Sequence, residues 1–120
     1  MAAKATVSDI KKARVTIELD GDEYTLIPSP DAILTLSMKY DGIAPLMAAI
    51  SRIQVQAMAD TVIAGLGLKG SEAREIAEKI AMSPIIDDLL PKLSEFASIL
   101  ANGGRPLKSK KDEEGGDRPL

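Results

Sequence analysis

The spacing of apolar residues changes once along this 120-residue chain, from a period of two near the start to a helical period after residue 30. Between residues 14 and 27 (RVTIELDGDEYTLI), apolar and polar side chains alternate, which is the pattern of a half-buried strand. Asp20-Gly21 interrupts the alternation with two residues that tolerate the positive φ angles of a tight turn. The segment therefore predicts a β-hairpin whose first strand buries three side chains: Val15, Ile17 and Leu19.

The register of this hairpin depends on which two residues form its loop. If Asp20-Gly21 is the loop, Ile17 faces Tyr24, and if the loop lies one residue later, Ile17 faces Leu26. Both registers keep the same apolar set on one face, so the burial prediction holds for either. Because an isolated two-stranded hairpin is only marginally stable in water, we expect its apolar face to pack on the helices that follow or on another chain.

After the hairpin, five segments carry apolar residues at spacings of three and four, which predicts a helix in each. The second and third could form one continuous helix. A change of apolar phase and the β-branched residues near Ile53 favour a break there. The chain is therefore predicted to form four or five helices from these segments: 30–41, 43–52, 54–64, 71–81 and 83–101.

Several helix ends carry residues that commonly cap helices. Ser29 followed by Pro30 is typical of a helix start, because a serine hydroxyl accepts from free amides and the first turn does not need an amide donor from proline. Gly42 is expected to end that helix in the left-handed conformation. Ser71 and Ser83 are predicted to cap the fourth and last helices in the same manner.

Glycine and proline also predict a loop and an interruption. The density of glycine between residues 65 and 70 predicts a loop there. Pro91 lies within the last helix and removes the hydrogen bond to the Asp87 carbonyl, but the apolar phase continues across it, which favours a kink over a stop. The residues predicted to face inward in that helix are Ile86, Leu89, Leu90, Leu93, Phe96, Ala97 and Leu100.

These elements predict a single domain over residues 14–104, of α+β class and mostly α, with the hairpin first and the short helices after it. Residues 1–13 show no clear period and are interpreted as a flexible lead. Residues 105–120 contain two leucines as their only apolar side chains apart from proline. A segment of that composition buries too little surface to offset its ordering entropy, which predicts a disordered, charged C-terminal tail.

Composition and charge narrow the possible functions. The chain has neither cysteine nor histidine, which removes disulfides, thiolate metal sites and histidine-based nucleophile pairs. Residues 14–104 carry seven Lys and Arg against thirteen Asp and Glu, a net charge of −6, and an acidic body repels nucleic acid. No apolar run approaches the ~20 residues of a membrane span. We expect a cytoplasmic protein that binds neither nucleic acid nor membrane.

Two motifs suggest chemistry, and each has a simpler interpretation. The GLGLKG run at 65–70 matches the spacing of a dinucleotide loop, but a helix rather than a strand precedes it, which favours a plain turn. Asp87-Asp88 and the row of Glu72, Glu75 and Glu78 are carboxylate clusters on predicted helices, where a solvated face or a helix N-terminus accounts for them. The sequence therefore predicts no enzyme and no catalytic, cofactor or metal site. A metal-dependent enzyme using Asp87 or Glu75 is a distant alternative, which would be stabilised by Mg²⁺.

Methionine gives the clearest indication of a binding protein. One methionine lies on or near each of four predicted helices: Met38, Met47, Met58 and Met82. Such side chains fill gaps in cores, which is their commoner use, but they also suit surfaces that accept varied partners. With no catalytic set of residues beside them, they favour a binding role over an enzymatic one.

In the order of these features the chain resembles the small tail-assembly chaperone family of long-tailed bacteriophages, particularly the version encoded in alphaproteobacterial gene transfer agents. The resemblance covers residues 14–104 and consists of structural positions rather than a catalytic signature. The matching residues are the turn at 17–21, Pro28, Ala32, Ile33, Leu36, Gly42-Ile43, Leu46, the run 63–66, Leu93, Phe96, Leu100 and Gly103-Gly104.

Such proteins hold tail-tube subunits or the tape-measure protein soluble before the tube polymerises, and are absent from the finished particle. The resemblance thus implies a non-catalytic partner of tape-measure or tail-tube proteins in the host cytoplasm, with homo-oligomers possible. The alternative is a small cytosolic helical adaptor or regulatory protein, dimeric through the hairpin edge and unrelated to phage. Our hypothesis for the partner-binding surface comprises the hairpin face and the first two helices: Val15, Ile17, Tyr24, Leu26, Met38, Leu46, Met47 and Ile50.

Overall fold

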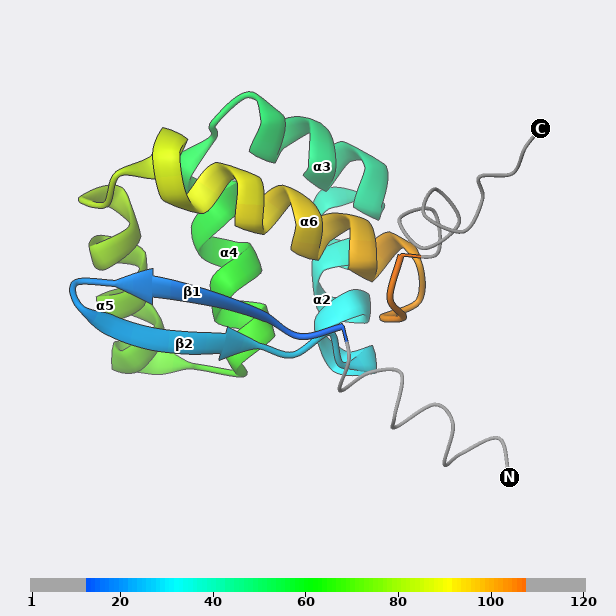
Figure 1. Ribbon diagram of the computed structural model, residues 1–120. Coiled ribbons are helices and arrows are strands. Elements are labelled where there is room, and N and C mark those ends of the chain that lie inside the picture. The colour runs from blue at the N-terminus through cyan, green and yellow to red at the C-terminus, as the bar shows by residue number, and fades with distance from the viewer. Residues whose placement is uncertain (1–12, 108–120) are drawn as a thin grey trace.

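The computed structural model describes residues 13–107 (Figure 1). The predicted N-terminal lead at 1–13 and C-terminal tail at 105–120 lie outside this range, except for their inner ends. There Ala13 is buried in the core and Leu107 is half-buried against it, so the lead and the tail were predicted to begin too close to the domain. Within it, the chain forms an antiparallel two-stranded hairpin followed by five α-helices and one π turn, which confirms the predicted α+β, mostly α class. The helices and turn are α2 (Pro30–Tyr40), α3 (Ile43–Ser51), α4 (Val55–Leu66), α5 (Gly70–Ala81), the π turn (Ile85–Leu89) and α6 (Leu90–Ala101).

The hairpin consists of β1 (Val15–Leu19) and β2 (Asp22–Leu26). Ile17 pairs with Tyr24, so the first of the two predicted registers is confirmed and the later loop is wrong. The loop residues Asp20 and Gly21 have φ angles of 55° and 87°, the left-handed pair that matches the twist of a hairpin. In β1 buried and exposed residues alternate strictly, as predicted.

The hairpin lies across the helical layer, with α6 beside β1 and α4 beside β2 (Figure 1). At the end of β2, the buried Leu26 and Phe96 meet the backbone of α4 at Gly65, where an added Cβ would lie 3.1 Å from Leu26 and 3.2 Å from Phe96. The Ile27 amide also donates to the Gly65 carbonyl at 3.0 Å. A glycine at this position therefore lets strand and helix approach closely.

That contact corrects the predicted loop at 65–70. Gly65 and Leu66 belong to α4, the loop is reduced to residues 67–69, and Gly70 already opens α5. Glycine density suggested a turn, but tertiary packing holds Gly65 in the helix. The left-handed residue that ends α4 is Gly67, at φ 69°.

The helix starts show which predicted caps form. The Ser29 hydroxyl accepts from the Ala32 amide at 3.1 Å, with Pro30 in the first turn, as predicted. Ser71 does not cap α5, because Lys69 occupies the capping position and makes no side-chain bond. Ser83 instead donates to the Lys79 carbonyl at 2.7 Å, so its hydroxyl satisfies the end of α5 rather than the start of the next helix.

Two chain reversals use left-handed residues other than glycine. The end of α2 is Asp41 at φ 61°, so the prediction that Gly42 fills this role is wrong by one residue. Gly42, at φ 123°, begins α3. The predicted break between the second and third helices is confirmed. It contains Ile53, whose left-handed φ angle is 60°.

The predicted interruption at Pro91 takes the form of a π turn. The Leu90 amide donates to the Ile85 carbonyl, five residues back, and α6 then begins with Pro91 in its first turn, where no donor is needed. Ile86, predicted to face inward, is 66% exposed, because the wider turn shifts the phase of the side chains before Pro91. The remaining inward prediction holds from Leu89 onward, except that Leu90 is only half-buried.

The core is shared by all the elements of the described chain. Its largest fully buried side chains come from both strands, α2, α3, α4, α5, the π turn and α6, and Phe96 of α6 is the biggest among them. Asn102-Gly103-Gly104 ends α6 as predicted, and beyond it Leu107 is half-buried against the core. Between residues 13 and 107, no single helix is long and apolar enough to cross a bilayer, and α2 and α3 reach that composition only together, bent by 76° at their junction.

Candidate interaction surface

The partner-binding hypothesis can be compared with burial residue by residue. Five of its eight residues are buried in the core and present no exposed face in this structure: Val15, Ile17, Leu26, Leu46 and Ile50. The physical reason is that the helices cover the apolar face of β1 and the end of β2, so these side chains stabilise the fold. Tyr24 and Met47 are half-buried, and Met38 alone of the eight is largely exposed, at 83%.

Large apolar side chains nevertheless remain on the surface at two places. Leu34 and Met38 lie one turn apart on α2 and are 63% and 83% exposed. Met82 ends α5 at 86% exposure, and Ile86 follows in the π turn. Met58, by contrast, is fully buried, as expected for core filling.

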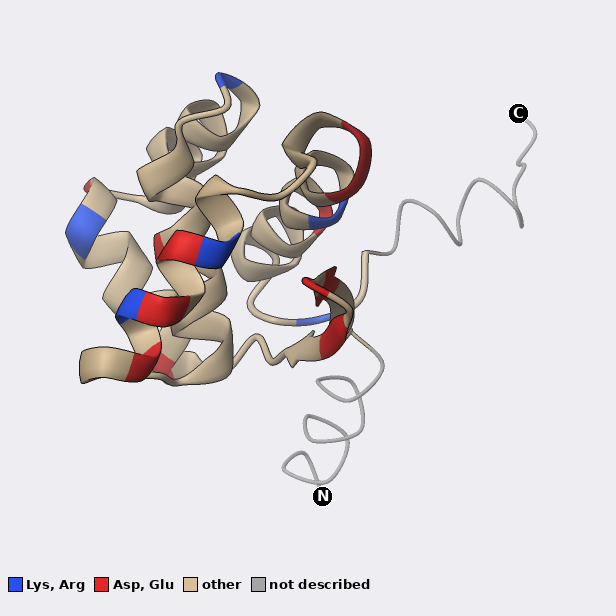
Figure 2. Cartoon of the chain, turned by 90° about the vertical axis from the view of Figure 1, so that its left-hand side faces the viewer, with Lys and Arg blue, Asp and Glu red and all other residues tan. Residues whose placement is uncertain are grey.

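Beside Met82 the surface is hollowed at the end of the molecule where the hairpin turns. A cavity of about 460 Å³ is lined by Met82 together with Asp20 of the hairpin turn, Glu75 and Glu78 of α5, and Lys79, Ser83 and Pro84. Three carboxylates and one ammonium line it, so the cavity carries a net negative charge. Figure 2 views the molecule from this end, where acidic segments lie on the hairpin and on the neighbouring helices.

Lys79 connects α5 to the hairpin. Its ammonium donates to the Tyr24 hydroxyl at 3.4 Å and lies 6.0 Å from the centre of that ring. The bond to Tyr24 is the main cause that raises the pKa of Lys79, with the charges of Asp22 and Asp20 adding to it. The lysine thus stays protonated and orients α5 against β2.

A second hollow of about 330 Å³ lies between β1 and the π turn. It is lined by Ile17 and Glu18 of β1 and by Asp87, Asp88, Leu89, Pro91 and Lys92. Again three carboxylates face one ammonium, and the Lys92 ammonium donates to the Thr16 carbonyl at 3.1 Å. Asp87 and Asp88 are both exposed.

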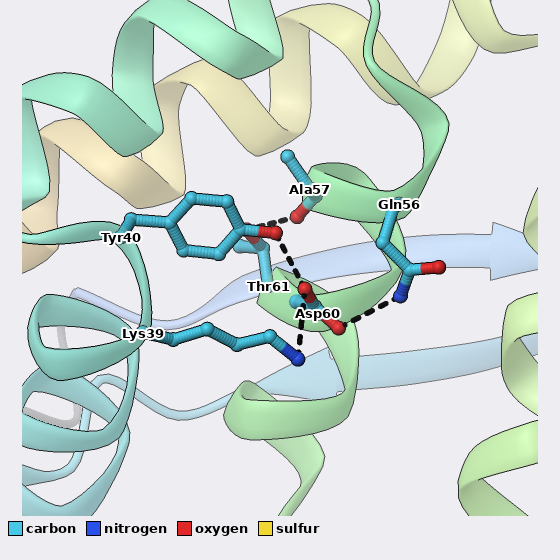
Figure 3. A network of polar contacts seen from close by, with 6 residues as sticks. All are labelled: Lys39, Tyr40, Gln56, Ala57, Asp60 and Thr61. Carbon is cyan, nitrogen blue, oxygen red and sulfur yellow. Dashed lines mark hydrogen bonds and ion pairs between the residues drawn. The ribbon is translucent and has the colours of Figure 1, made fainter.

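The one buried carboxylate among residues 13–107 is Asp60 of α4, at 8% exposure (Figure 3). The Tyr40 hydroxyl donates to one of its oxygens at 2.5 Å and the Gln56 amide to the other at 3.0 Å, while the Lys39 ammonium lies 3.3 Å away. Burial raises the pKa of Tyr40, and the bond to Asp60 and its charge raise it further. These contacts join the end of α2 to α4 and satisfy the buried charge.

Neither a family model, nor a curated protein, nor a solved structure matches the chain. The site must therefore be interpreted from its own geometry. In the part of the chain that the structure describes, no three acidic side chains converge as metal ligands would. The GLGLKG run spans the end of α4 and the start of α5, and no strand precedes it as a dinucleotide loop requires.

Sequence reasoning missed three of the residues described above. Asp60 could have been found, since it is the single charged residue in the otherwise apolar and neutral segment Val55–Leu66, a pattern typical of a buried and partnered group. Met82 was considered only as one methionine of four. Ile86 was placed in the core because nothing in the sequence marks a π turn ahead of Pro91.

Proposed function

We propose that this chain is a tail-assembly chaperone of the kind found in long-tailed bacteriophages and gene transfer agents. It would bind the tape-measure or tail-tube protein in the host cytoplasm before the tail forms, without catalysis. The family resemblance supports this, and the residues that carry it take defined places in the fold. Asp20-Gly21 forms the hairpin turn, while Leu46 and Phe96 are fully buried.

The observation that carries the proposal is apolar surface left outside a well-filled core. Leu34 and Met38 on α2, and Met82 and Ile86 at the hairpin-turn end, are large apolar side chains exposed by more than half. A protein that binds a client and later releases it needs apolar contacts that can form and break without unfolding. Exposed side chains supply them, since clustered apolar surface on a folded domain is typical of protein interaction sites.

Co-expression tests the proposal. A tape-measure protein and a tail-tube protein of a gene transfer agent would be produced with the full chain, or with an unrelated acidic protein of similar size as the control. We expect the full chain to raise the soluble fraction of at least one client and to co-purify with it. Unchanged solubility and no co-purification for both clients would contradict the proposal.

A further inference from the structure

Met82 and Ile86 form an apolar pair at the end of the molecule where the hairpin turns. They are 86% and 66% exposed, at the end of α5 and in the π turn. Neither contributes to the core, so their apolar character has no evident role in stability. Methionine is flexible enough to pack against partners of varied shape.

Each residue of this pair adjoins an acidic hollow. Met82 itself lines the first hollow, and Asp87 and Asp88, which follow Ile86, line the second. The name acidic end is used here for the apolar pair and its six carboxylates: Met82, Ile86, Asp20, Glu75, Glu78, Glu18, Asp87 and Asp88.

The cations beside the acidic end do not neutralise it. Carboxylates outnumber lysines by three to one in each hollow, and each lysine also donates to the hairpin, Lys79 to Tyr24 and Lys92 to the Thr16 carbonyl. Glu78 meets Arg74 at 3.7 Å, but both side chains are more than two-thirds exposed. Because such surface ion pairs are weak, a partner's cation can replace the arginine.

We propose that the acidic end binds a basic amphipathic segment of a partner protein. An apolar side chain of that segment contacts Met82 and Ile86, while its lysines or arginines pair with the carboxylates on either side. The same carboxylates repel nucleic acid and anionic membranes. A second copy is disfavoured because residues 14–104 carry a net charge of −6. This inference names the kind of partner segment that the proposed function requires. That the partner is a tail-assembly client rests on the proposed function.

The partner's chemistry is tested with three labelled synthetic peptides, each about five turns of helix, titrated into the full chain. The first is an amphipathic helix of leucine and lysine, the second has glutamate in place of lysine, and the third has serine in place of leucine. We expect binding of the first peptide only, measured by fluorescence anisotropy, with affinity that falls as salt is added. Equal binding of the glutamate peptide would overturn the proposal.

The location is tested with variants that leave the core intact. The double variant Met82→Ser/Ile86→Ser should weaken binding of the leucine-lysine peptide at least ~10-fold, a change of ~1.4 kcal/mol. The matched control is Leu34→Ser/Met38→Ser, which removes a similarly exposed apolar pair from α2 and should leave binding unchanged. For charge, Glu78→Lys should weaken binding about threefold, while Glu95→Lys, an exposed carboxylate on α6, should not. Thermal melting confirms that each variant is folded.

Equal loss of binding in the α2 control, or none in the Met82→Ser/Ile86→Ser variant, would overturn the proposal. Dissociation of a dimer by that variant in sedimentation would assign the surface to a second copy and overturn it as well. The co-expression assay separates the two proposals. If wild type and Met82→Ser/Ile86→Ser capture a client equally, only the proposal for the acidic end is contradicted. If the peptide binds but no client is captured, only the chaperone proposal is contradicted.

Discussion

The two ends of the hairpin differ in how tightly they are packed. Where β2 ends, Leu26 and Phe96 pack directly against Gly65 of α4, which has no side chain. Where the hairpin turns, Asp20 and Gly21 are exposed, and the adjoining α5 buries only two of its side chains. The tight contact at Gly65 and the acidic end thus lie at opposite ends of the hairpin, so that the acidic end can change chemically without affecting that contact.

The largest loss of stability is expected at Phe96, in the tightly packed end. Replacing this fully buried ring with alanine should lower the free energy of unfolding by about 3–5 kcal/mol, because the removed atoms leave a cavity among fixed neighbours. Ile86→Ala, at the exposed end, should change it by no more than ~0.5 kcal/mol. Urea denaturation of both variants measures the difference. A similar loss at both positions would mean that the Ile86 side chain is part of the core after all.

A smaller effect is expected from two adjacent glycines. Gly103 and Gly104 have φ angles of 72° and 81°, but a Cβ would meet nothing at Gly103 and would lie 2.7 Å from the Pro28 carbonyl at Gly104. Gly103→Ala should cost about 1 kcal/mol, from the left-handed backbone alone. Gly104→Ala should cost a further ~1–3 kcal/mol, since α6 must move away from the chain that follows the hairpin. Equal melting temperatures for the two variants would show that the contact between residue 104 and the Pro28 carbonyl is not tight.

The smallest effect concerns Tyr40, which joins α2 to α4 between the two ends. At pH 8, Tyr40→Phe should lower the free energy of unfolding by about 1 kcal/mol, through loss of the bond to Asp60. Folding raises the Tyr40 pKa, so above pH ~10 the unfolded chain releases this proton before the folded chain does, and that part of the stability is lost as pH rises. The gap between wild type and Tyr40→Phe should therefore narrow from pH 8 to pH 11. A gap that stayed constant would contradict the raised pKa.

Local chemistry was sufficient to predict the elements whose signals lie within a few residues. The alternation around Ile17 and the turn at Asp20-Gly21 predicted the hairpin, and Ser29-Pro30 predicted the start of α2. The same approach failed where distant packing decides. Gly65 is helical because Leu26 and Phe96, far away in sequence, hold it against the strand. Ser83 bonds back to α5 because the chain reverses there.

The candidate surface was harder to predict, for a related reason. An apolar face indicates burial or binding equally well, and only the arrangement of the helices shows that the face of Val15 and Ile17 is covered. The exposure of Ile86 depends on a π turn, whose hydrogen bond five residues back has no marker in the sequence. The carboxylates of the acidic end come from β1, the hairpin turn, α5 and the π turn, so the fold alone brings them together.

The packing of Leu26 and Phe96 on Gly65 also sets an order of events during translation. The hairpin leaves the ribosome first, but its apolar face is covered by the helix that is synthesised last among the described elements. A nascent chain that ends before α6 therefore leaves the apolar face of β1, with Val15 and Ile17, exposed to solvent. The domain can complete its core only once translation has passed residue 100, so messages truncated upstream of that point should yield aggregation-prone fragments.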